Sequence, residues 1–178
     1  MSALTSLTLA FPRWMEPALP DCHFPSLRFI KLFDISDPVL LLLLPFLERH
    51  GTLITGLHIR SQFYFNVLPS ILSRTTSLQS IVLDQNGLGH LSMIPGSDLS
   101  LPSMSYVGIQ LKYHPGSGDT YTVPLITSWM GQLLTNRVFP GLREVRLLDL
   151  ESHEPLETEC QDLSTLCRSH NVVLSGKE

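Results

Sequence analysis

Residues 76–88, T-S-L-Q-S-I-V-L-D-Q-N-G-L, decide the fold of this chain. They fit the pattern L-x-x-L-x-L-x-x-N-x-L at Leu78, Ile81, Leu83, Asn86 and Leu88. Because successive side chains of a strand point to opposite faces, Ile81 and Leu83 share one face. The pattern therefore predicts a short strand followed by a tight inward turn, in which the amide of Asn86 bonds the backbone groups of the bend.

The same pattern returns along the whole chain. Its leading apolar residue recurs at Leu4, Leu27, Ile54, Leu78, Met104 and Leu142. Four of the five intervals lie within the roughly 20–29 residues typical of leucine-rich repeats, and an insertion lengthens the last. Because the matches are in register over the whole length, they predict an α/β leucine-rich-repeat solenoid of about six to seven irregular repeats. Such a solenoid has a curved parallel sheet with short helices on its convex side.

The connections between the expected strands predict several helices and loops. Helices are expected at 38–49, 67–74, 125–137 and 159–169, with Pro45 kinking or shortening the first. The glycines at 87 and 89, with Pro95 and Gly96, predict an irregular connection after the strand of residues 80–84. Polar segments at 114–122 and 153–158 are expected to be loops, and the last strand is expected at 171–174.

Composition narrows the class of protein. The chain has 178 residues, of which 43% are hydrophobic, which is enough for one domain over residues 1–178. A net charge of -4 lacks the basic excess of a nucleic-acid-binding protein. The longest apolar run, 39–47, is far shorter than the roughly 20 residues needed to span a membrane. Three cysteines without a C-x-x-C motif argue against a disulfide framework, and no signal peptide is evident, so we expect a cytoplasmic or nuclear protein.

Three segments carry a resemblance to a known family. They are F-P-S-L-R-F-I-K-L at 24–32, F-P-G-L-R-E-V-R-L-L-D-L at 139–150 and C-R-S-H-N-V-V-L at 167–174. The chain resembles the C-terminal leucine-rich-repeat region of fungal (basidiomycete-type) F-box proteins over essentially its whole length. The resemblance implies an arc of strands backed by helices, and the substrate-recognition part of a ubiquitin-ligase receptor.

The same resemblance implies that adaptor binding and substrate binding lie in different segments. In that family an F-box precedes the repeats and binds a Skp-type adaptor. No F-box is found here, because the repeats begin at Leu4. The chain is therefore expected to lack an N-terminal cap and an F-box, and to meet the adaptor only through a missing N-terminal segment.

The strand face that points away from the core is where a solenoid presents a repeated binding surface. Aromatic and cationic side chains, which are enriched where binding energy concentrates, occur on it. The predicted partner-binding residues are Phe29, Lys31, Phe33, His58, Arg60, Asp84, Tyr106, Gln110, Lys112 and Arg146. Lys31, His58 and Arg60 would form a basic column suited to an acidic or phosphorylated segment. The alternative is an ordinary solvated sheet face whose charges serve solubility.

Catalysis finds little support in the sequence. The seven histidines show no metal-ligand spacing such as H-E-x-x-H, and no G-x-S-x-G motif occurs. The segment G-S-G-D at 116–119 lacks the lysine of a phosphate-binding loop, and His58 with Asp84 is expected to be an ion pair. We therefore predict no enzyme, no cofactor and no metal site. The expected partner is a protein rather than a nucleic acid or a membrane.

Two other functions stay open beside the ligase receptor. One is a leucine-rich-repeat scaffold or sensor that takes no part in ubiquitin ligation. The other is a non-functional fragment of a longer receptor, an idea motivated by the uncovered first repeat.

Overall fold

A computed structural model describes most of the chain. The described residues are 3–10, 22–33, 37–60, 68–94, 99–111, 123–148 and 156–176. The loop predicted at 114–122 lies outside them.

Seven parallel strands in the described residues form one sheet, and their order in the sheet is their order in the chain. The strands are β1 (Ser6–Ala10), β2 (Phe29–Phe33), β3 (Gly56–Arg60), β4 (Ser80–Asp84), β5 (Tyr106–Gln110), β6 (Glu144–Leu148) and β7 (Val173–Ser175). Each strand pairs with the next one along the chain. The predicted α/β class with a parallel sheet is therefore confirmed.

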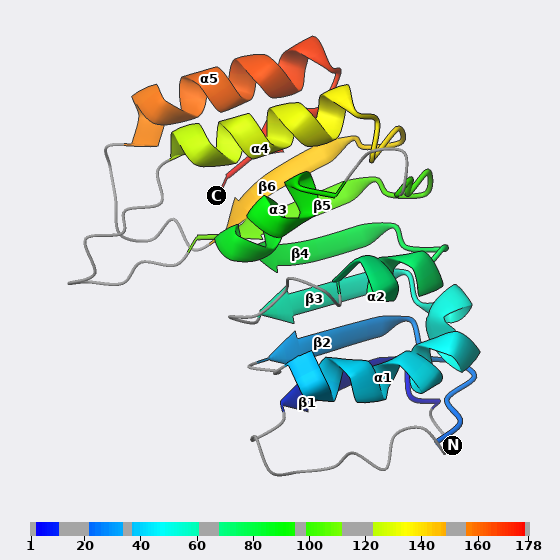
Figure 1. Ribbon diagram of the computed structural model, residues 1–178. Helices are drawn as coiled ribbons and strands as arrows, with labels where there is room; N and C mark the ends of the chain where they lie inside the picture. The colour runs from blue at the N-terminus through cyan, green and yellow to red at the C-terminus, as the bar shows by residue number, and fades with distance from the viewer. Residues whose placement is uncertain are drawn as a thin grey trace, which may run out of the picture.

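The connecting helices lie along one face of this sheet (Figure 1). They are α1 (Asp37–His50), the short turn η2 (Gly51–Leu53), α2 (Leu68–Arg74), α3 (Gln85–Ser92), α4 (Val123–Thr135) and α5 (Leu156–Ser169). Parallel neighbours need crossover connections, and these have one preferred hand. Because every crossover moves to the next strand in the same direction, all the helices are placed on the same side. The opposite face of the sheet carries no helix of the described residues.

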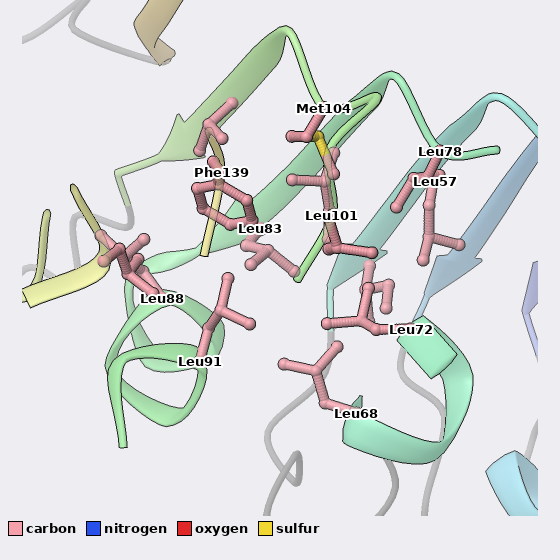
Figure 2. Packing of buried hydrophobic residues seen from close by; sticks show 14 of the residues in the cluster. Leu57, Leu68, Leu72, Leu78, Leu83, Leu88, Leu91, Leu101, Met104 and Phe139 are labelled. Carbon is pink, nitrogen blue, oxygen red and sulfur yellow. The ribbon is translucent and has the colours of Figure 1, made fainter. Parts of the chain in front are cut away.

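The core fills the space between the sheet and the helices. Alternate strand residues point into it, so that Ile30 and Leu32, for example, are at most 2% exposed. Figure 2 shows side chains of β3 and β4 converging with those of α2 and α3. The buried residues labelled there are Leu57, Leu68, Leu72, Leu78, Leu83, Leu88, Leu91, Leu101, Met104 and Phe139. Leu4, the expected first residue of the first repeat, is 43% exposed and lies outside this core.

A backbone hydrogen-bonding pattern repeats at the entrance of β2 to β6. Two successive N–H groups donate to one carbonyl, that of the residue directly before the preceding strand, at 2.8–3.1 Å. The accepting carbonyls are those of Thr5, Arg28, Thr55, Gln79 and Ser105. We call these the forked bonds. The leading apolar residues all make the same kind of backbone bond. Each donates its N–H to the carbonyl three residues earlier, and this holds for Leu27, Ile54, Leu78, Met104 and Leu142.

The helices agree with the sequence except after β4. Four of them lie within three residues of their predicted bounds, and α1 continues through Pro45 to His50. Helix α5 begins at Leu156, so the loop predicted at 153–158 is wrong for its last three residues. The last strand begins at Val173, two residues later than predicted.

The irregular connection predicted after β4 is wrong at Gly87 and Gly89, because α3 forms there, whereas Pro95 and Gly96 lie outside the described residues. The Asp84 side chain accepts a hydrogen bond from the Gly87 N–H at 2.9 Å and so caps the start of the helix. The turn role expected of Asn86 therefore belongs to Asp84, and Asn86 lies inside the helix. Gly89 lies against the Trp129 ring of α4, so this glycine allows the two helices to approach closely.

Helices α4 and α5 end in the same way. The N–H of Val138 donates to Leu133 and that of Val172 to Cys167, at 3.1 and 2.8 Å. The residue before each, Arg137 or Asn171, has a positive φ of 53° or 58°. This is the Schellman arrangement, in which glycine or asparagine is favoured at the left-handed position. Asn171 suits that position, whereas Arg137 is strained.

We predict that Arg137→Gly stabilises the protein. The left-handed conformation costs an L-residue about 1–2 kcal/mol, and the extra freedom of glycine in the unfolded chain offsets about 0.4–1 kcal/mol of the gain. The free energy of unfolding should rise by about 0.5 kcal/mol, measured by urea denaturation. The control Asn136→Gly, one residue earlier and still helical in its bonding, should be destabilising. An Arg137→Gly protein no more stable than the wild type would contradict the assignment of strain.

Candidate partner-binding surface

The sheet face opposite the helices, here called the open face, is formed by alternate strand residues. They are Phe29, Lys31, Phe33, His58, Arg60, Ser80, Val82, Tyr106, Gln110, Glu144 and Arg146. Arg60 is exposed and the others are half-buried, whereas the strand residues between them are buried. The structure thus brings eight of the ten predicted partner-binding residues onto one continuous face.

Asp84 and Lys112 are the two that it does not bring there. Asp84 is 1% exposed because its carboxylate turns inward to cap α3, so its predicted place on the exposed face is wrong. The alternation of side chains along β4 predicts that Asp84 is exposed. This prediction fails because the chain bends into α3 directly after Asp84. Lys112 lies outside the described residues.

The register of the sheet sets which side chains are neighbours. Lys31 of β2 lies opposite His58 of β3, and Phe33 lies opposite Arg60. The predicted basic column is therefore part of a block of four residues, in which Lys31 is paired with His58 and Phe33 is paired with Arg60. Val82 of β4 continues the row of Lys31 and His58, and Gly108 and Arg146 follow it on β5 and β6.

Aromatic side chains on β2 lie against the sheet instead of standing away from it. A Cβ on Gly56 would overlap Cδ2 of Phe29 and lie 2.5 Å from Cε2, so the ring covers this glycine. The Lys31 Nζ lies 5.7 Å from the centroid of the same ring, a cation–π distance. The Phe33 ring meets the His58 ring edge-on, with centroids 5.2 Å apart and planes at 77°. These contacts give β2 and β3 a low, partly apolar surface between their charges.

A second aromatic lies over a glycine at the other end of the face. The Tyr106 hydroxyl would be 3.2 Å from a Cβ on Gly108. Burial raises the pKa of Tyr106, the Arg146 charge opposes this rise and the Glu144 charge adds to it. Glu144 also accepts a hydrogen bond from the Ser175 hydroxyl at 2.6 Å. Arg146 and Glu144 thus lie close enough to the Tyr106 phenol for their charges to have opposite effects on its pKa.

The charges of the open face are therefore unevenly distributed. On β6, Arg146 has Glu144 two residues away, so positive and negative charge occur together. On β2 and β3, the open-face residues include Lys31, His58 and Arg60 and no acidic residue. The chain as a whole has a net charge of -4, so this block is a local positive region on an acidic protein.

A cluster of aromatic rings around the buried His50, near β2, was not predicted from the sequence. His50, which is 1% exposed, stacks with Phe46 at 4.7 Å and with His23 at 5.4 Å between ring centroids. Its Nε2 donates to the Cys22 carbonyl oxygen at 3.1 Å. The cluster fixes the segment before β2 onto α1. Sequence reasoning had no signal for it, because the rings come from segments far apart in the chain.

Two pockets near the C-terminal end were also not predicted. One of about 510 Å³ is lined by Leu134, Thr135, Arg137, Phe139, Pro140, Leu142, His170 and Val172. The other, of about 460 Å³, is lined by Leu147, Cys160, Gln161, Ser164, Thr165, Arg168, Leu174, Ser175 and Gly176. Among the described residues, neither lining includes a carboxylate.

In the described part of the chain, no group of three or more His, Cys, Asp or Glu side chains is placed to hold a metal ion. No helix among the described residues is both long and apolar enough to cross a membrane. Comparison of the chain with protein-family models, with curated proteins and with solved structures found no match in any of the three.

We predict that Gly56→Ala displaces the Phe29 ring. The substitution should lower the free energy of unfolding by about 1 kcal/mol through overpacking. In a Phe29→Ala background the same substitution should be neutral or stabilising, because alanine favours an extended strand more than glycine does. A double-mutant cycle by urea denaturation measures the coupling. Gly131→Ala is the control, since its Cβ would meet only Leu166 at 3.7 Å. Equal costs of Gly56→Ala in both backgrounds would disprove the contact.

We also predict that Cys167 resists alkylation in the native protein. Burial raises the pKa of the Cys167 thiol to about 11, so almost none of the reactive thiolate is present at pH 8. Cys22 and Cys160 are less buried and should be modified first by iodoacetamide, as measured by peptide mass spectrometry. Modification of Cys167 at the rate found in denaturant would show that this part of the core opens readily.

Proposed function

We propose that the chain is a leucine-rich-repeat solenoid that binds a protein partner through its open face. The repeated sequence pattern and the repeated backbone bonds support the solenoid, because both recur at the same place in successive strands. The leading apolar residue and the forked bonds mark each strand entrance from β2 to β6. A solenoid of this kind presents its strand face as an extended binding surface.

The observation that carries the binding role is the composition of the open face. It holds Phe29, Phe33, Tyr106, Arg60 and Arg146 on adjacent strands, with no described helix over them. Aromatic and arginine side chains are the types most enriched at the centres of interfaces. A face that served solubility alone would carry mostly charged residues, so these aromatics favour a partner.

By its resemblance to fungal F-box proteins, we place this module in a ubiquitin-ligase receptor. The module would select the protein to be modified, in the cytoplasm or nucleus, and it would perform no chemistry and need no cofactor. Contact with a Skp-type adaptor is assigned to a separate F-box rather than to the residues described here.

The binding role is tested with two variants that add the same charge at different places. Val82→Glu lies at the centre of the open face, and Ser128→Glu lies at an exposed position of α4. Proteins captured from a fungal lysate by the wild-type chain should be retained by Ser128→Glu and lost by Val82→Glu. Capture that survives Val82→Glu, or that both variants abolish equally, would exclude the open face.

The ligase role needs a separate experiment. A longer chain that includes an F-box should co-purify with a Skp-type adaptor and a cullin. If the captured proteins depend on Val82 but no adaptor is found, the module is a scaffold or sensor instead.

A further inference from the structure

The positive block on β2 and β3 has a geometry that selects among acidic partners. Its cationic groups do not converge on one point. The Lys31 Nζ leans over the Phe29 ring, toward the start of β2, while Arg60 is the last residue of β3. Lys31 lies opposite His58 and two residues before Phe33, the register partner of Arg60, so the rows of Lys31 and Arg60 are about 6.6 Å apart along the strands. The charges of Lys31 and Arg60 therefore form a line along the strands.

The spacing of this line matches an extended peptide. Alternate side chains of an extended chain share one side and repeat about every 6.6 Å. Two acidic residues separated by a single residue therefore lie about 6.6 Å apart, the spacing of the Lys31 and Arg60 rows. A lone phosphate is much smaller than this and would meet one end of the line at a time.

The surface between the charges also suits an extended chain. The Cδ2–Cε2 edge of the Phe29 ring covers Gly56, and the Phe33 ring lies against His58. The surface of the block between its charges is therefore apolar, and a peptide backbone with small side chains could pack against it. Asp84, the acidic residue at the end of the neighbouring strand, is buried as the cap of α3 and presents no charge there.

We propose that Lys31 and Arg60, on either side of the Phe33 and His58 rings, bind an extended acidic segment of a protein partner, in which carboxylates alternate with small residues. The inference rests on the proposed function and names the chemistry of its partner. The acidic segment lies along β2 and β3, with its alternate carboxylates facing the line of cations.

The test uses the whole chain and a fluorescein-labelled peptide in which three glutamates alternate with serines. Fluorescence anisotropy at low ionic strength measures its dissociation constant. A peptide of the same composition with its glutamates in succession is the spacing control, and should bind about fivefold more weakly, the loss of one ion pair. Binding should weaken with added salt, because screening shortens the reach of exposed charges.

Matched variants locate the site. Lys31→Gln and Arg60→Gln should each weaken binding about fivefold, while Arg168→Gln, which removes an exposed charge from α5, should leave it unchanged. Thermal unfolding of each variant checks that the fold is retained. Equal affinity for both peptides, or an equal effect of Arg168→Gln, would overturn the proposal. So would tight binding of a single phosphoserine peptide or of a single-stranded oligonucleotide without binding of the alternating peptide.

The two proposals can fail separately. If the alternating peptide does not bind but lysate proteins are still lost with Val82→Glu, the acidic segment is wrong and the open face remains the binding surface. If the peptide does not bind and capture does not depend on Val82, both proposals fail.

Discussion

The forked backbone bonds at the strand entrances are the constraint on which the rest of the structure depends. At each entrance from β2 to β6, two N–H groups share the carbonyl of the residue directly before the preceding strand. This fixes the position of each strand relative to its neighbour before any side chain is considered. A shift by one residue would turn every core side chain to the open face, so the bonds and the apolar alternation enforce the same register.

That register also determines the open face. Side chains from five repeats fall into rows, and neighbours in a row come from residues more than twenty positions apart in the chain. Two glycines in these rows, Gly56 and Gly108, leave room that aromatic side chains occupy. The face is therefore smoother than its sequence suggests, because Phe29 and Tyr106 are partly used within the protein. In the β2–β3 part of the face, the accessible side chains are therefore mainly those of Phe33, Arg60 and Lys31.

Charge and packing divide the open face into two parts. At β6, Arg146 and Glu144 act on the same Tyr106 phenol with opposite effects on its pKa. At β2 and β3, the positive side chains lie among aromatic rings, and Asp84, at the end of the neighbouring strand β4, is buried. An acidic partner would therefore be attracted to the β2–β3 part. A residue-by-residue inventory of charge does not reveal this division, because it depends on which carboxylates are accessible.

The sequence by itself determined the strands, the direction in which their side chains point and most of the helices. These features follow from local periodicity, which acts within a few residues of the chain. It also placed eight of the ten candidate residues on one face. Only the tertiary structure decided that Asp84 is a buried cap, that α3 forms despite its glycines, and that His50 stacks with His23. Each of these depends on contacts between segments that are distant in sequence, or on where the chain bends out of the sheet. Local patterns carry no information about such contacts.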